Sequence, residues 1–248
     1  MQKIYVDRKI EKSRVIIYCL EASLAIIGLV MFILAMLKIN FGSIEIPMGS
    51  RISSSLMAIL LAFAFMAVEL IFRYRFPIML HIIYFAYVFA SVIVGSNFGV
   101  FRHDVLIMGD MMGWYDKITH AILGYILCVI AIYLSQRGKV WGKSKFGDIL
   151  LIVAISMAYA SIWEMFEFTV DHTIPNQSMQ RNSLIDTMLD IIAHFVFTVV
   201  FVIQYIIEKC AGVNLGIAFM EKNLNTGGWV PRKNQELPAE NTGDSEAV

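Results

Sequence analysis

The stretch VIIYCLEASLAIIGLVMFILAML, residues 15–37, decides the fold class of this chain. Glu21 is its single charged residue, and its length falls within the roughly 17 to 25 mostly apolar residues that a helix needs to cross a bilayer. A helix satisfies its own backbone in lipid, so we predict a transmembrane helix here. The run is too long for the core of a signal peptide, and no convincing small-residue cleavage site follows it, so we expect the helix to be retained.

Five more segments of this kind follow along the chain. They are residues 55–72, 76–99, 118–134, 149–170 and 185–207. Hydrophobic residues make up 58% of the chain and charged residues only 16%, against roughly 25% charged in soluble domains. We therefore predict an all-α fold, a polytopic membrane helix bundle with about six transmembrane helices. The lipid bilayer is its expected surrounding partner.

The positions of the Lys and Arg residues predict the orientation. Fifteen of the 20 lie in the N-terminal segment, in the loops after the second and fourth spans, or in the tail. Cytoplasmic loops are enriched in these residues, so we expect both termini in the cytoplasm. The chain then divides into a cytoplasmic N-terminal segment (1–14), a six-helix transmembrane domain (15–209) and a cytoplasmic tail (210–248). The tail is expected to be disordered from about residue 223, where Gly, Pro, Asn and Glu become frequent.

Charge and motifs exclude several classes of function. The 20 basic residues balance the 20 acidic ones, so no global field favours nucleic acid. Neither a phosphate-cradling GxxxxGK[ST], nor a GxGxxG, nor a GxSxG elbow occurs, so we expect no nucleotide substrate. The three cysteines have no metal-binding or disulfide spacing.

Three segments carry ionisable residues at helical spacing. They are WYDKITHAILGY (114–125), SIWEMFEFTVDH (161–172) and RNSLIDTMLDIIAH (181–194). Such residues cost roughly 2.5 to 3.5 kcal/mol each inside a span, so they usually face the bundle interior and serve a function. Residues three, four or seven apart share one helix face. We therefore expect eight side chains to form polar stripes at the outward-facing end: Asp116, His120, Glu164, Glu167, Asp171, Asp186, Asp190 and His194.

If the three helices pack as neighbours, these stripes form one acidic and histidine-rich cluster. The carboxylates cannot all be ionised there without compensation, which bound metal, shared protons, or the cations Lys117 and Arg181 could supply. Mixed oxygen and nitrogen ligands suit zinc, manganese or iron, and magnesium is a further candidate divalent metal. The candidate metal ligands are His120, Glu164, Glu167, Asp186, Asp190 and His194. The candidate catalytic groups are Asp116, His120, Glu164, Glu167 and Asp190.

Structural alternatives remain for several of these residues. Asp186 follows Ser183 by three positions, which also fits a helix-capping acid. Asp171 could be a solvated loop residue, and Asp190 with His194 could make only an inter-helix hydrogen bond. A second group near the inner face is expected to form structural ion pairs with nearby arginines such as Arg14. Its members are Glu21, Glu69, His81 and Asp148.

The motifs resemble those of the YjdF-like family of uncharacterised bacterial membrane-spanning proteins. The resemblance runs from about Ile71 to His194 and rests on three elements: DKxxH at 116–120, WExxE at 163–167 and DTMxD at 186–190. His194 and Phe197 depart from the family pattern. The DKxxH element is also similar to VanZ-like envelope proteins. The resemblance implies a location in the bacterial plasma membrane and names no reaction.

These observations leave three hypotheses about function. The leading one is a metal-dependent hydrolase or transferase that acts on a lipid or lipid-linked envelope substrate. The second is a small cation or proton-coupled transporter or ion-binding protein, which requires a polar route from the cluster toward Glu21, Glu69 and His81. The third is a non-catalytic envelope stress factor.

Overall fold

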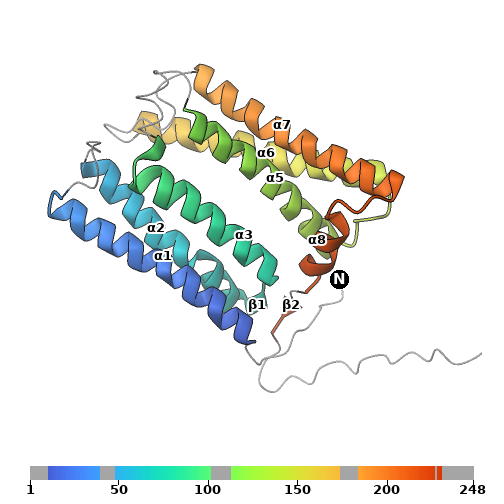
Figure 1. Ribbon diagram of the computed structural model, residues 1–248, viewed down its shortest axis with the longest axis horizontal. Coiled ribbons are helices and arrows are strands. Elements are labelled where there is room, and N and C mark those ends of the chain that lie inside the picture. Colours follow the sequence, from blue (N-terminus) through green and yellow to red (C-terminus); the bar gives the residue numbers. More distant parts are fainter. Residues whose placement is uncertain (1–10, 40–47, 102–112, 174–183, 227, 231–248) are drawn as a thin grey trace, which may run out of the picture.

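The computed structural model describes residues 11–39, 48–101, 113–173, 184–226 and 228–230 (Figure 1). The long helices are α1 (Lys12–Met36), α2 (Met48–Phe72), α5 (Trp114–Arg137), α6 (Lys145–Thr173) and α7 (Leu184–Ala211). Between α2 and α5, helix α3 (Ile78–Val88) continues directly into the π-helix η1 (Phe89–Asn97). A short helix, α8 (Ile217–Leu224), and two two-residue strands, β1 (Tyr74–Arg75) and β2 (Gly228–Trp229), complete the described part.

Six helices are long and apolar enough to cross a membrane, so the predicted polytopic bundle is confirmed. The spans are Lys12–Met36, Arg51–Phe72, Ile78–Asn97, Trp114–Arg137, Lys145–Thr173 and Leu184–Ala211. Most of them extend beyond the predicted apolar runs. Thr173, for example, lies three residues beyond the predicted end of the fifth span, because a helix continues into the polar layer where its side chains reach water.

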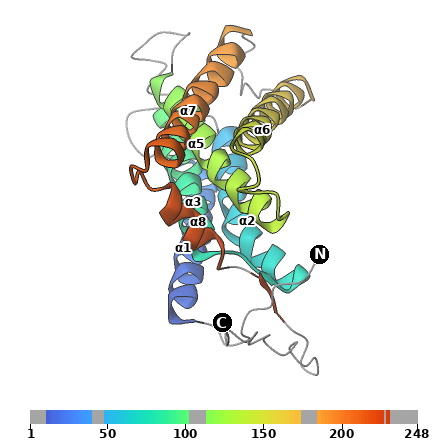
Figure 2. The same ribbon diagram turned by 90° about the vertical axis from the view of Figure 1, so that its right-hand side faces the viewer.

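The spans form two groups of three (Figures 1 and 2). In the first unit α1 packs along α2, and α3 with η1 lies against both; in the second, α5 packs against α6 and α7. A glycine permits a close approach between helices in each unit. A Cβ built on Gly28 would lie 3.0 Å from the carbonyl oxygen of Ser55, and one built on Gly124 only 2.3 Å from the carbonyl oxygen of His194. Small residues therefore set the distances between helices, as is usual in membranes.

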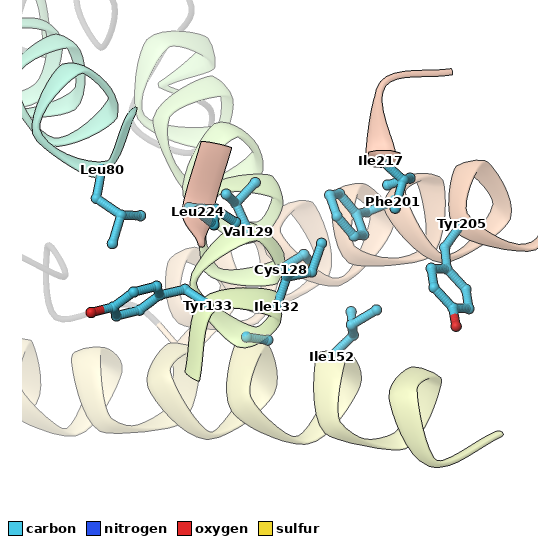
Figure 3. Close-up of a cluster of buried hydrophobic side chains, with 11 residues drawn as sticks. Leu80, Cys128, Val129, Ile132, Tyr133, Ile152, Phe201, Tyr205, Ile217 and Leu224 are labelled. Carbon is cyan, nitrogen blue, oxygen red and sulfur yellow. The ribbon is translucent and has the colours of Figure 1, made fainter. Parts of the chain in front are cut away.

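An apolar core fills the half of the α5–α7 unit in which α5 and α7 end and α6 begins (Figure 3). Cys128, Ile132, Ile152 and Phe201 are all 0% exposed there. Other apolar side chains, such as Leu60 and Ile162, are 69% and 64% exposed. On a membrane-spanning helix these exposed side chains face lipid, so they carry no cost of contact with water.

The segment after α7 returns to the α2–α3 connection. Glu208 accepts hydrogen bonds from the backbone N–H groups of Ile217 (2.8 Å) and Ala218 (2.6 Å), so a carboxylate caps the start of α8. Strand β2 then pairs antiparallel with β1. The described part of the tail thus runs to residue 230 with a gap at residue 227, and the predicted disorder beyond it falls on residues 231–248, which lie outside the described part of the chain.

An even number of spans places the starts of α1 and α8 at the same end of the bundle (Figure 1). We call this the inner end, because the Lys and Arg count predicts that it faces the cytoplasm. The opposite end, at which α5 and α7 begin, is the outer end.

Single-cysteine labelling tests this orientation. In a chain without its native cysteines, Asp104→Cys is expected to react with an impermeant maleimide added to intact cells, whereas Lys143→Cys is expected to react only after the membrane is opened. Position 143 is exposed between α5 and α6, so a lack of access would reflect the membrane and not burial in the protein. The reverse labelling pattern would overturn the orientation.

Candidate functional site

Three helices bring the predicted polar residues together at the outer end. We call the group formed by Asp116, Lys117, His120, Glu164, Glu167, Asp186 and Asp190 the α5–α7 cluster. Apart from Asp116 and Lys117, which are partly exposed, its members are buried. Each helix contributes because its polar residues follow the helical repeat. On α7 the buried face includes Asp186, Asp190 and His194, which are spaced four apart.

Lys117 lies at the centre of the carboxylates. Its Nζ is 2.6 Å from Oδ1 of Asp186, 2.6 Å from Oδ1 of Asp190 and 3.1 Å from Oδ2 of Asp116. Of the two cations that we expected to compensate the carboxylates, Lys117 is in contact with them, and Arg181 lies outside the described residues. Asp186 contacts Lys117 from the first turn of α7, so it does more than cap a helix. Ser183, its suggested capping partner, also lies outside the described residues.

Asp116, His120 and Asp190 form a candidate metal centre. One ligand atom from each lies within 4.8 Å of the other two. Nε2 of His120 is 3.8 Å from Oδ1 of Asp116 and 3.8 Å from Oδ1 of Asp190. Ligand atoms that bind zinc at about 2.0–2.2 Å lie roughly 3.0–3.6 Å from one another. The three ligand atoms would therefore have to move closer together to bind one ion. Imidazole and carboxylate are both suitable ligands for divalent metals, although the common catalytic triad has two histidines and one carboxylate and this group has the reverse ratio.

Glu164 and Glu167 approach this centre from α6. Oε1 of Glu164 is 3.9 Å from Nδ1 of His120, on the side of the ring opposite the three-residue group. Glu167 accepts a hydrogen bond of 2.8 Å from Nε1 of Trp163, which holds the carboxylate in place. Both glutamates are buried.

His194, another predicted ligand, has a different partner. Its Nε2 shares a hydrogen bond of 2.9 Å with Oγ of Ser156, and that hydroxyl is also 2.8 Å from Oγ1 of Thr198. The sequence interpretation missed Ser156 and Thr198. The signal was available, because Thr198 continues the four-residue spacing of α7 beyond His194 and Ser156 precedes Glu164 by eight residues on α6.

Asp171, a predicted member of the polar stripe, and the neighbouring His172 are not part of the candidate metal centre. Asp171 is partly exposed, and His172 is exposed with Nδ1 2.7 Å from the carbonyl oxygen of Phe168. The ring of His172 also lies 4.0 Å from that of Phe168, centroid to centroid. His172 therefore belongs to the end of the helix.

Toward the inner end, the polar stripe stops at the apolar core of Figure 3. Below Thr198 the interior of the unit is filled by Ile132, Ile152 and Phe201, each 0% exposed. Beside Phe201, the partly buried Tyr125 donates from its hydroxyl to Oε1 of Gln204 at 2.6 Å. On the buried side of α7, the next polar side chain after Thr198 is Tyr205, whose hydroxyl donates to Oδ2 of Asp148 at 2.7 Å. Within the described part of α5–α7, the fully buried side chains between Thr198 and Tyr205 are thus apolar.

The inner polar group divides between the two units. Asp148 lies in the second unit, where it also accepts from the backbone N–H of Gly142 at 3.0 Å. Glu21, Glu69 and His81 lie together in the first unit, and Arg14 forms the expected ion pair with Glu69 at 2.8 Å. Glu21, Glu69 and His81 therefore lie on α1, α2 and α3, which contribute no residue to the α5–α7 cluster.

Fold and site together define a multi-pass helical membrane protein with a buried polar cluster on its last three spans. The chain belongs to the family described as "Predicted membrane protein (DUF2238)", whose model matches residues 17–209. This match confirms the expected kinship with a family of membrane-spanning proteins, and it covers all three motif elements.

A curated relative supports the same assignment. An "Uncharacterized protein" of Thermotoga maritima is 30% identical over 100 residues, which cover 38% of this chain and 50% of the relative. The chain therefore matches about half the length of that relative. No solved structure matches the chain.

Proposed function

We propose that this protein is a metal-dependent hydrolase or transferase of the bacterial plasma membrane that acts on a lipid or lipid-linked envelope substrate. The observation that carries the proposal is the convergence of Asp116, His120 and Asp190, from two helices, on one point at the outer end. A divalent cation held there would polarise a phosphoryl or carbonyl oxygen and make bound water more acidic.

Neighbouring side chains support this role. Glu164, near Nδ1 of His120, is placed to orient the ring so that Nε2 faces the cation, as carboxylates commonly do for metal-binding histidines. Lys117 offsets part of the carboxylate charge. Glu167 is the remaining buried carboxylate on this face of α6, and it is the candidate general base or acid.

The surroundings of the cluster favour a substrate that is dissolved in the bilayer. On α6, the apolar side chains next to the two glutamates point away from the protein: Ile162 is 64%, Met165 68% and Phe168 54% exposed. One helix therefore separates the carboxylates from lipid. A lipid or lipid-linked molecule could approach along the membrane, with its polar head at the depth of the cluster.

The transport hypothesis has weaker support. It requires polar groups that continue from the cluster toward the inner end. His194, Ser156 and Thr198 extend the stripe by about two helical turns, but the fully buried side chains that follow, Ile152 and Phe201, are apolar. A polar site bounded by apolar side chains on its buried side fits binding and catalysis better than passage of an ion. No observation specifically favours a stress factor.

Metal analysis of the purified full chain tests the proposal. After loading with zinc, manganese, iron or magnesium and removal of excess ion, the wild type is expected to retain metal and His120→Ala to lose it. Glu164→Gln is expected to weaken binding roughly 10- to 100-fold, because it removes a group that orients a ligand.

His172→Ala is the matched control, since His172 is exposed near the end of α6 and is not part of the candidate centre. It should bind metal as the wild type does. A wild type that retains none of the four metals, or a His120→Ala variant that binds as well as the wild type, would sink the proposed metal centre.

A further inference from the structure

The first three-helix unit contains its own buried polar group, which the proposed function does not use. Tyr18 donates a hydrogen bond to Oε2 of Glu69. Oε1 of Glu69 is 3.1 Å from Nε2 of His81, and Nδ1 of the same ring is 2.7 Å from Oε1 of Glu21. The imidazole thus joins two carboxylates through both ring nitrogens. His81 and Glu21 are both 0% exposed.

The hydrogen bonds constrain where the protons are. An ionised carboxylate can only accept, so when both carboxylates are ionised the imidazole between them carries a proton on each nitrogen and is positively charged. Arg14 supplies the second positive charge at Glu69. The positive groups Arg14 and His81 therefore balance the carboxylates of Glu21 and Glu69. The other titratable groups nearby are the phenols of Tyr18 and Tyr84, and Tyr84 donates to the carbonyl oxygen of Leu61 at 2.6 Å.

The two glutamates of this group differ in how their oxygens are hydrogen-bonded. Both oxygens of Glu69 are engaged, since Oε1 also accepts from the backbone N–H of Phe76 at 2.6 Å and Oε2 accepts from Tyr18. By contrast, Oε2 of Glu21 is buried and has no hydrogen-bond partner among the described residues. Leaving a charged oxygen buried without a donor is costly. A proton added there removes the negative charge from this oxygen.

Apolar residues surround the far side of Glu21. Toward the outer end, the unit continues with Leu24, Ala58, Ala62, Val88 and Ile93, none of them more than 2% exposed. Toward the inner end, the hydrogen-bonded chain leads from Glu21 through His81 and Glu69 to the partly exposed Tyr18. Among the described residues, the polar groups that contact Glu21 therefore lead toward the inner end.

We infer that the α1–α3 unit contains a proton-binding site, separate from the α5–α7 cluster, in which Glu21 takes up and releases a proton on the inner side of the membrane. On uptake, a proton from water forms an O–H bond at Oε2 of Glu21, while His81 keeps both of its N–H bonds. The net charge of Arg14, Glu21, Glu69 and His81 rises from zero to plus one. Release breaks the same O–H bond and returns the proton to water. Chains of Glu and His inside membrane spans serve proton binding in pumps and transporters.

Infrared difference spectroscopy of the full chain in lipid vesicles tests this site. Acidification of the wild type is expected to produce the C=O stretching band of a protonated carboxyl group in an apolar environment. Glu21→Gln is expected to lose that band, because the amide keeps the acceptor for His81 but cannot be protonated in the same range. Glu21→Asp keeps a carboxyl group, so the band should shift in frequency and remain.

Asp148→Asn is the matched control. Asp148 is as buried as Glu21 and also lies toward the inner end, but both of its oxygens accept hydrogen bonds from Gly142 or Tyr205. This variant should keep the wild-type band. No carboxyl band in the acidified wild type, or a band that Glu21→Gln leaves unchanged, would overturn the inference and leave a static ion-pair network. The result does not depend on metal at the α5–α7 cluster.

Discussion

Replacing Lys117 by methionine is expected to lower the free energy of unfolding by about 3–5 kcal/mol, the usual cost of removing one partner of a buried ion pair. Methionine has a similar length and stays apolar, so the main loss is the positive charge. The Nζ group of Lys117 is 2.6 Å from both Asp186 and Asp190, and Asp190 is only 2% exposed. Without the ammonium group these carboxylates face each other at low dielectric. Unfolding in mixed detergent micelles measures the effect.

Two further variants define the cause of that loss. Lys143→Met removes an exposed lysine between α5 and α6, and it is expected to change stability by less than about 0.5 kcal/mol. Adding Asp186→Asn to Lys117→Met removes one of the uncompensated charges, so it should restore part of the stability. If the double variant is as unstable as the single one, the loss does not come from carboxylate repulsion.

Gly124→Ala is expected to destabilise the protein by about 1–3 kcal/mol, although alanine is the better helix former by about 1 kcal/mol. The added Cβ would lie 2.3 Å from the carbonyl oxygen of His194, which belongs to the backbone of α7 and cannot turn aside. The two helices must therefore separate. Because α5 carries His120 and α7 carries Asp190, the same change is also expected to weaken metal binding.

Gly147→Ala is the matched control for this substitution. It lies in the first turn of α6, where the added methyl group would meet Cβ of Ser144 at 3.5 Å, an ordinary contact. This variant should be as stable as the wild type or slightly more stable. Equal stability of Gly124→Ala and the wild type would show that α5 and α7 are not held at this close distance.

Much of the architecture could be predicted from the sequence, because each span is a local property. Length and hydropathy define a transmembrane helix without reference to its neighbours, and all six were predicted. The polar stripes are also local. Residues such as Asp186, Asp190 and His194 share a face of α7 in any packing, because the helical repeat alone places them there.

Other features depend on contacts between helices. The sequence interpretation treated Lys117 as one of two nearby cations, whereas in the structure its ammonium group joins carboxylates from α5 and α7. Similarly, His194 was grouped with the metal ligands, but its Nε2 contacts Ser156 on α6. Spacing along one helix gives a face, and it does not give the partner on the next helix.

The sequence by itself therefore determined six spans, their polar faces and membership in a family of membrane proteins. Only the tertiary structure decided that the spans form two units, that Asp116, His120 and Asp190 converge, and that His81 contacts Glu21 whereas Asp148 has its partners in the other unit. The physical reason is the range of the forces involved. Transfer into lipid acts on each helix alone, whereas an ion pair or hydrogen bond requires atoms placed within a few tenths of an ångström. That placement depends on close contacts such as Gly124 against His194.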